Sequence, residues 1–389
     1  MKVAIMGRTL DDEGGIYIAT SSLMDTIIEL DRETEYVVLY RTRREFGRYR
    51  GYSHVKELLF WAPTKLLWDQ LLVPYYARRE GVDVILNPKF TVPLLSGRPT
   101  VAICQGTEYY TLPQFYSLTE RLHARTLMPL YYGKASRVIT VSDDVQHDLH
   151  RYLGVPYERM ETVYLAPGEQ FYPRTDRGEL EAFRLKHGLP QTFVVAVTRG
   201  YQDGRLYPRK NIDNVLRAFL TLKDELPDLR LVFAGTDIHR YVSTVFGREV
   251  ADDPRLVYVG WLARDDMPLL YSLARALLFP SYSESYGLPI AEAMACGCPV
   301  ITSTGGACPE IAGDAALIVD PTDIEGLATG IRRVVTDAGL SQTLTRKGLR
   351  RAREFSWARS AQRVIEVCRE IVHGADGGVV RKTSSLSTS

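Results

Sequence analysis

The chain has 389 residues, of which 45% are hydrophobic and 24% are charged. This composition excludes a disordered or collagen-like protein, and at about 150 residues per domain the length suggests two packed domains. Because 48 lysines and arginines are matched by 47 acidic residues, the formal net charge is only +1, which argues against a nucleic-acid-binding protein that works through a basic surface.

The N-terminus and the cysteines both indicate a cytoplasmic protein. The first apolar stretch ends at Arg8, too short for the core of a signal peptide, and no later stretch reaches about 18 uninterrupted apolar residues. The five cysteines are an odd set, and Cys296, Cys298 and Cys308 are clustered. This distribution fits reduced thiols better than disulfides. The cluster also lacks a nearby fourth ligand, so we do not expect it to hold a metal ion.

The first half of the chain alternates predicted strands with predicted helices. Residues 2–7 (KVAIMG) form a β-rich run, a loop with Gly14 and Gly15 follows, and residues 16–30 have helical spacing. Further strands are predicted at residues 35–40, 82–88, 99–106 and 137–142. Most of them precede a stretch with helical spacing, and such alternation predicts a parallel sheet.

The second half repeats this pattern after Pro- and Gly-containing punctuation near residues 166–173. Strands are predicted at 192–198, 229–235, 255–261, 276–280, 298–303 and 316–320, with helices between most of them. We therefore expect an α/β protein of two doubly wound, Rossmann-like domains, residues 1–170 and 171–355, which face each other across a ligand-binding cleft. Residues 374–389 are rich in Gly and Ser without periodicity, which predicts a disordered tail.

The strongest chemical signal is the segment SESYGLPIAEAMACG (283–297). Pro289 suits the first turn of a helix and Gly297 suits a left-handed helix end, so a short helix is predicted. Its N-terminus opens at Gly287 and Leu288. Free N–H groups and the positive end of the helix dipole favour phosphate oxygens at that point.

Two carboxylates flank this phosphate site, Glu284 before the helix and Glu292 inside it. Because phosphate repels a carboxylate, the pair suggests acceptors for neighbouring hydroxyls, such as those of a sugar and a ribose. The segment resembles the glutamate, seven residues, glutamate motif of the retaining family-4 glycosyltransferases of GT-B fold, with Tyr286 where that family usually has Phe. The resemblance continues through residues 270–281 and 305–321, and more weakly at 14–16, 67–74 and 137–149.

This resemblance implies a function for each part of the motif. Glu284 would hold hydroxyls of the donor sugar, Glu292 the ribose hydroxyls, and the N–H groups of Gly287 and Leu288 the sugar and the diphosphate. The implied donor-binding set also includes Gly14, Gly15, Arg205 and Tyr286. By the same resemblance the first domain binds the acceptor, the second binds the donor, and a last helix (356–373) crosses back to the first domain.

A second signal lies in VAVTRGYQDGRLYPRKNIDNVLRAF (195–219). A departing nucleoside diphosphate gains negative charge, which fixed cations stabilise most in the transition state. The resemblance assigns Lys210 to this task together with an arginine. Either Arg199, which follows the predicted strand directly, or Arg205, in the sequence GRL, fits the arginine position. We favour Arg199 as the catalytic residue, beside Lys210 and Glu284.

The first domain departs from the family after the strand at 99–104. Many relatives have a histidine there, whereas this chain has Gln105, which cannot exchange a proton near neutral pH. Gln105 would either orient acceptor hydroxyls or only satisfy backbone groups of its loop. The family scheme, in which a donor phosphate oxygen takes the acceptor proton on the same face, tolerates this change. No D-x-D sequence is present, so we expect no metal and no cofactor besides the nucleotide-sugar substrate.

The acceptor is less constrained. Residues 41–52 (RTRREFGRYRGY) combine five arginines with aromatic residues, and an apolar stretch that includes LWDQLLVP follows. This pattern suits peripheral contact with an anionic membrane or a lipid-linked acceptor. A solvated loop followed by a core helix explains it equally well.

Taken with the resemblance, these residues predict a metal-independent retaining hexosyltransferase. GDP-mannose is our first choice of donor, ahead of UDP-glucose and UDP-N-acetylglucosamine. The expected acceptor is a glycan or lipid-linked acceptor of envelope polysaccharide or glycolipid synthesis, reached from the cytoplasm at the inner membrane face. The alternatives are a non-catalytic nucleotide-sugar-binding subunit and a sugar-nucleotide epimerase of GT-B fold.

Overall fold

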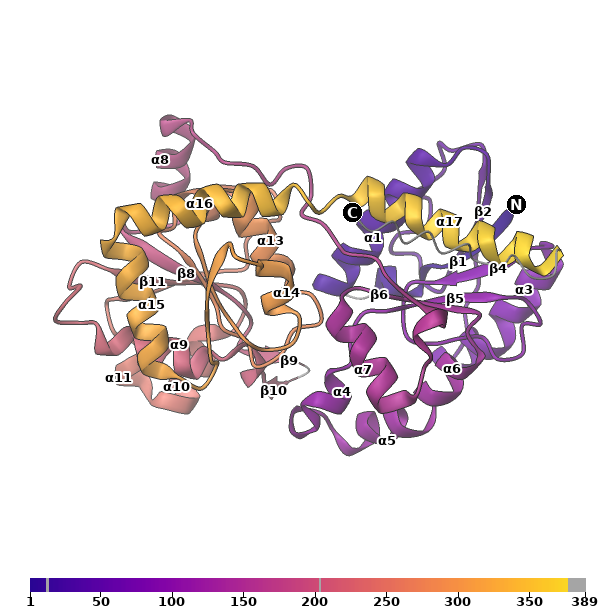
Figure 1. Cartoon of the computed structure of the whole chain (residues 1–389), viewed down its shortest axis with the longest axis horizontal. Helices are drawn as coiled ribbons and strands as arrows, with labels where there is room; N and C mark the ends of the chain where they lie inside the picture. Colours follow the sequence, from indigo (N-terminus) through magenta and orange to yellow (C-terminus); the bar gives the residue numbers. More distant parts are fainter. Residues whose placement is uncertain (12–13, 203, 377–389) are drawn as a thin grey trace, which may run out of the picture.

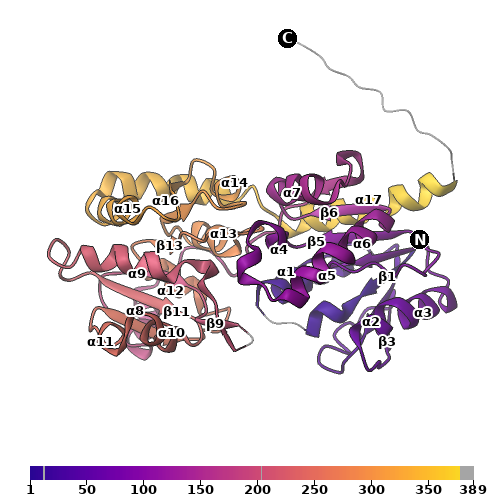
Figure 2. The same ribbon diagram turned by 90° about the horizontal axis from the view of Figure 1, so that it is seen from below.

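The protein consists of two lobes, and the chain passes between them twice (Figure 1). The structure is a computed structural model that describes residues 1–11, 14–202 and 204–376. In each lobe helices cover both faces of a parallel sheet, as the view from below shows (Figure 2). This architecture confirms the predicted fold class of two doubly wound α/β units.

The first lobe is built on a seven-stranded parallel sheet in the order β3-β2-β1-β4-β5-β6-β7. Its strands are β1 (Lys2–Met6), β2 (Glu35–Tyr40), β3 (Val55–Leu59), β4 (Val84–Asn87), β5 (Thr100–Cys104), β6 (Arg137–Thr140) and β7 (Met160–Thr162). The central strands are almost entirely buried, which accounts for their continuous apolar sequences. Sequence patterns missed the edge strands β3 and β7 because charged residues interrupt them.

The second lobe contains a six-stranded parallel sheet in the order β12-β11-β8-β13-β14-β15. Its strands are β8 (Phe193–Val197), β11 (Arg230–Ala234), β12 (Leu256–Gly260), β13 (Leu277–Phe279), β14 (Val300–Ser303) and β15 (Ala316–Val319). A small antiparallel hairpin of β9 (Tyr201–Gln202) and β10 (Arg205–Leu206) follows β8. It occupies the stretch that separates Arg199 from Lys210.

The helices connect these strands. In the first lobe they are α1 (Gly15–Leu30), α2 (Lys65–Leu67), α3 (Val73–Arg79), α4 (Glu108–Thr111), α5 (Leu118–Thr126), α6 (Met128–Lys134) and α7 (Asp143–Leu153). In the second they are α8 (Arg177–Lys186), α9 (Ile212–Thr221), α10 (Ile238–Phe246), α11 (Arg248–Ala251), α12 (Met267–Leu273), α13 (Leu288–Ala295), α14 (Cys308–Ala312), α15 (Ile324–Thr336) and α16 (Ala338–Ala352). Side chains cap several of them, as Ser142 does for α7.

The last helix, α17 (Trp357–Asp376), lies across the first lobe and packs on α1 (Figure 1). Arg363 of α17 pairs with Glu161 of β7 through a contact of 2.7 Å. The helix includes residues 374–376, which the sequence assigned to a disordered tail, so that part of the prediction was wrong. Residues 377–389 of that tail lie outside the described residues, and the domain limits at 170 and 355 stay predictions.

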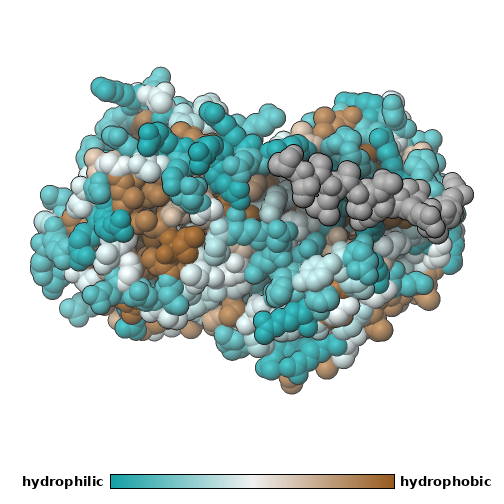
Figure 3. Space-filling view, viewed as in Figure 1, coloured by the Kyte–Doolittle hydropathy of each residue, from teal (hydrophilic) through white to brown (hydrophobic). Residues whose placement is uncertain are grey.

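Among the described residues no helix is long and apolar enough to cross a membrane. The face shown in Figure 3 is mostly hydrophilic, and its hydrophobic residues gather mainly on the second lobe. The apolar side chains of both sheets therefore pack internally for the most part.

Candidate active site

A cavity of about 840 Å³ lies between the two lobes, at the carboxyl ends of strands from both sheets. This is where a pair of doubly wound domains is expected to bind its ligand. Most of the predicted site residues line it: Gly15, Gln105, Arg199, Arg205, Lys210, Tyr286, Gly287, Leu288 and Glu284. The structure therefore brings most of the residues that the sequence singled out into one cavity.

Lys210 and Glu284 form a buried ion pair, with 2.5 Å between Nζ and Oε1. Lys210 ends a short helical turn (Pro208–Lys210), and Asn211 behind it donates to the carbonyls of Pro280 and Pro321 at 2.8 and 2.6 Å. Burial alone would raise the pKa of Glu284, but the charges of Lys210 and Arg209 outweigh it and hold that pKa below its usual value. Glu284 is therefore a charged acceptor that already has a cation beside it.

The glycine before α13 opens the helix toward the cavity. Gly287 has a φ of 91°, a left-handed conformation that favours glycine, and Leu288 begins the helix. Their N–H groups belong to the first turn, where they have no partner within the helix. Gly287, Leu288 and Lys210 line the same cavity, and the phosphate site at this helix N-terminus stays a prediction.

Tyr286 lies in the cavity wall but turns its hydroxyl away, toward the segment that links the lobes. The hydroxyl donates to the carbonyl of Leu165, and the ring lies 6.5 and 5.9 Å from the rings of Tyr164 and Phe355. The hydroxyl that distinguishes Tyr286 from the usual Phe thus ties the glutamate motif to the link between the domains.

Glu292 lies on α13, three residues beyond Pro289, and is not among the residues that line the cavity. It is buried and pairs with Arg264 at 3.2 Å. Burial raises the pKa of Glu292, and Arg264 offsets only part of that effect. The two carboxylates of one motif thus have opposite pKa shifts.

The structure separates the two candidate arginines. The guanidinium of Arg199 approaches the glycine loop of the first lobe so closely that a Cβ atom at Gly14 would lie 2.6 Å from its Nη2. Arg205 projects from the β9–β10 hairpin and is exposed. Arg199 therefore lies between the lobes, whereas Arg205 lies at the rim of the cavity.

Gln105 follows β5, as expected, and bonds within its own lobe. Its amide nitrogen donates to Thr20 at 3.1 Å and to the Pro88 carbonyl at 2.7 Å. These contacts connect Gln105 to α1 and to the loop after β4, which favours the structural interpretation of Gln105 over acceptor recognition.

Three charged residues that line the cavity were missed by sequence reasoning, Glu108, Glu120 and Arg209. Arg209 lies 3.1 Å from Glu108 and donates to the Tyr116 hydroxyl at 2.9 Å. Arg209 could have been found as the neighbour of Lys210, but no local pattern marks Glu108. No cluster of three or more metal-ligating side chains occurs within residues 1–11, 14–202 and 204–376.

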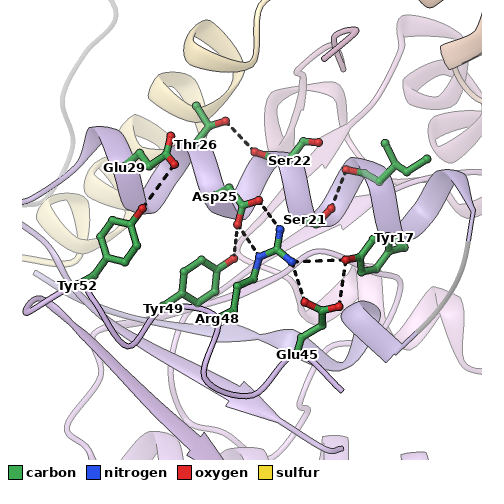
Figure 4. Close-up of polar contacts among 11 residues, drawn as sticks. Tyr17, Ser21, Ser22, Asp25, Thr26, Glu29, Glu45, Arg48, Tyr49 and Tyr52 are labelled. Carbon is green, nitrogen blue, oxygen red and sulfur yellow. Dashed lines mark hydrogen bonds and ion pairs between the residues drawn. The ribbon is translucent and has the colours of Figure 1, made fainter. Parts of the chain in front are cut away.

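The basic segment 41–52 is largely tied to α1 (Figure 4). Arg48 contacts Asp25 at 2.6 Å and Glu45 at 2.7 Å, and the buried Tyr49 donates to Asp25 at 2.9 Å. Because carboxylates neutralise this arginine, the segment is not the uniformly basic surface that its sequence suggests.

Two family models match the chain. The model described as Glycosyltransferase Family 4 matches residues 21–166, and the model described as Glycosyl transferases group 1 matches residues 201–351. The chain belongs to the family 4 glycosyltransferases. This confirms the resemblance found in the glutamate motif and extends it to the first domain of the enzyme.

Among curated relatives, this glycosyltransferase is 28% identical to the O-antigen chain mannosyltransferase B of Escherichia coli over 294 residues, which cover 75% of each chain. It is 25% identical to an E. coli serotype-specific mannosyltransferase WbdA over 66% of this chain, and it spans only 32% of that longer protein. Among solved structures, Anabaena Alr3699/HepE in complex with UDP and glucose has a TM-score of 0.73 at 20% identity, with 95% of this chain and 99% of that chain covered. WaaG, a glycosyltransferase involved in lipopolysaccharide biosynthesis, has a TM-score of 0.70 at 16% identity, with 94% and 99% covered. These structures support the GT-B fold.

Proposed function

We propose that this glycosyltransferase moves mannose from GDP-mannose, with retention of anomeric configuration, to a glycan or lipid-linked acceptor in envelope polysaccharide or glycolipid synthesis. The observation that carries the proposal is the 28% identity to an O-antigen mannosyltransferase over three quarters of both chains. The cavity suits a nucleotide sugar because cations, a helix N-terminus and carboxylates converge in or beside it.

In the proposed reaction the acceptor oxygen attacks the anomeric carbon on the face from which the diphosphate departs. The bond between that carbon and the phosphate oxygen breaks, and the departing phosphate oxygen takes the acceptor proton. Lys210, Arg199 and the N–H groups of Gly287 and Leu288 stabilise the charge that develops on the diphosphate, so no metal ion is required. Glu284 orients the sugar hydroxyls.

Steady-state assays with GDP-mannose, UDP-glucose and UDP-N-acetylglucosamine, all in EDTA, test this function. The acceptors are extracted lipid-linked glycans, and NMR of the product reports the anomeric configuration. We expect transfer from GDP-mannose alone, with an α-linked product. Nucleotide binding without transfer or hydrolysis would identify a binding subunit instead, and conversion of the donor to an isomeric sugar nucleotide would identify an epimerase.

We also propose that the enzyme attaches peripherally to the anionic cytoplasmic face of the inner membrane. The supporting surface is a ridge near α2 and α3 with five exposed apolar side chains: Trp61, Leu66, Leu67, Leu71 and Tyr75. Lys65, Arg78 and Arg79 beside it are exposed, and the sole carboxylate between residues 61 and 79, Asp69, is buried against Arg8 at 3.1 Å. Cations with apolar side chains complement an anionic lipid surface.

Vesicle sedimentation tests this attachment. We expect binding to vesicles that contain phosphatidylglycerol, little binding to pure phosphatidylcholine, and loss of binding in Leu66→Ser/Leu71→Ser. Equal sedimentation of the native protein with both vesicle types, or unchanged binding of the double variant, would contradict the proposal.

A further inference from the structure

Glu108 of the first domain contacts the two segments of the second domain that contain Lys210 and Glu284. Glu108, the first residue of α4, has its Oε1 atom 3.1 Å from Arg209 Nη1 and accepts a hydrogen bond from Ser285 Oγ at 2.7 Å. Arg209 directly precedes Lys210, and Ser285 directly follows Glu284. Glu108 therefore touches the neighbours of both members of the Lys210–Glu284 pair.

Glu108, Arg209 and Ser285 pack closely against one another. Glu108 and Ser285 are only 9% and 8% exposed. A Cβ atom at Gly106 would lie 2.3 Å from Glu108 Oε2 and 2.5 Å from Ser285 Oγ, so only glycine leaves room for this contact. Water competes little with a charge pair in such a place, and loss of one partner leaves the other buried and unpaired.

We propose that Glu108 is a positioning residue, which holds Arg209 and Ser285 from the opposite domain and so sets the separation of Lys210 and Glu284 when the domains are together. Lys210 is paired with Glu284. A bound diphosphate competes for Lys210, and Glu284 must then keep its place for the sugar without that partner. Glu108 supplies the restraint from outside the donor domain, and catalysis by fixed charges depends on such placement.

A second contact between the domains provides a matched control. The carboxylate of Glu310 accepts from the N–H groups of Asp143 and Asp144 at 2.7 and 3.1 Å, at the N-terminus of α7. Like Glu108 it bridges the two lobes, but it does not bond to Arg209 or Ser285. Glu310→Gln therefore weakens domain association without removing the restraint on the donor segments.

The test compares Glu108→Gln, Ser285→Ala and Glu310→Gln with the native enzyme. It rests on the proposed function only for its turnover assay, which follows release of GDP from GDP-mannose at saturating donor with extracted lipid-linked acceptor. GDP affinity is measured separately by calorimetry. We expect kcat to fall about 30-fold in Glu108→Gln and about fivefold in Ser285→Ala, with GDP affinity changed less than about threefold in both. Glu310→Gln should keep kcat within about threefold.

Three results would overturn the inference. The first is a native kcat in Glu108→Gln. The second is an equal loss of kcat in Glu310→Gln, which would show that Glu108 only holds the two domains together. The third is a loss of GDP affinity that parallels the loss of kcat, which would make Glu108 a direct donor contact. If Glu108→Gln does not fold, as judged by circular dichroism, Ser285→Ala decides by the same criteria. Failure of the native enzyme to release GDP contradicts the proposed donor instead, and is thus distinguishable.

Discussion

The two domains contribute different chemistry to one cavity. The second domain supplies paired charges from two short segments, among them Lys210 with Glu284 at 2.5 Å. The first domain supplies Gly15 at the start of α1, together with the amide of Gln105 and the carboxylate of Glu108 from the segment that follows β5. Donor chemistry concentrated in short segments leaves a sequence signature, whereas a surface assembled from distant loops leaves almost none.

Within the second domain, Glu284 and Glu292 show that one motif can hold two different carboxylates. Nearby cations hold the pKa of Glu284 below its usual value, whereas burial raises the pKa of Glu292. Glu284 is thus kept as a carboxylate, while the affinity of Glu292 for a proton is increased by its surroundings. The predictions below test this division, from the largest expected effect to the smallest.

Removal of Lys210 should have the largest effect. Lys210→Ala deletes a fixed cation beside the diphosphate and leaves Glu284 buried without its partner, so we expect kcat/KM to fall about 10³-fold in the GDP-mannose assay. Lys223→Ala, an exposed lysine just beyond α9 in the same domain, is the control and should keep native activity. A loss of kcat/KM below about tenfold would show that Lys210 does not stabilise the transition state.

The two arginines should differ strongly. Arg199→Ala removes the guanidinium that lies between the lobes beside Gly14, and we expect about a 10²-fold loss of kcat/KM. Arg205→Ala changes an exposed hairpin at the rim and should cost less than about threefold. A larger loss in Arg205→Ala than in Arg199→Ala would show that Arg205, and not Arg199, contacts the diphosphate.

Glu292 should affect nucleotide binding more than turnover. If its carboxylate accepts ribose hydroxyls, Glu292→Gln should weaken GDP binding about tenfold, as measured by calorimetry. Because the pKa of Glu292 is raised, GDP affinity of the native enzyme should fall as the pH is lowered through that pKa, and the variant should lack this dependence. Glu249→Gln, exposed on α11, should bind GDP normally. An unchanged affinity of Glu292→Gln for GDP would show that Glu292 does not bind the ribose and only pairs with Arg264.

How much the sequence could predict follows from where each signal lies. Most strands, the helix at Leu288 and the Lys210 and Glu284 positions were predictable because apolar runs, Gly287 and charged residues mark them locally, whereas the edge strands β3 and β7 were missed. The partner of Glu284 was not, because residues 74 positions apart meet only in the folded chain. The Glu108 contact with Ser285 spans 177 positions and joins two domains, so no local pattern could reveal it. The pairing of Arg48 in the basic segment 41–52 was not predictable for the same reason, since the carboxylate of Asp25 comes from α1.

The smallest expected effect concerns Asp144, a carboxylate of the first domain that lies near other carboxylates. Burial, with repulsion from Asp148, Glu310 and Glu108, raises the pKa of Asp144 to about 7. The folded protein therefore keeps a proton on Asp144 at pH values where the unfolded chain has released it, and stability is lost as the pH rises toward 7. Asp144→Asn should raise the free energy of unfolding by about 1 kcal/mol more at pH 8 than at pH 5, after allowance for partial exposure. Urea unfolding at both pH values measures this difference, and Asp143→Asn, at an exposed neighbouring carboxylate, should gain less. An equal gain at the two pH values would show that packing at Asp144, and not its charge, limits stability.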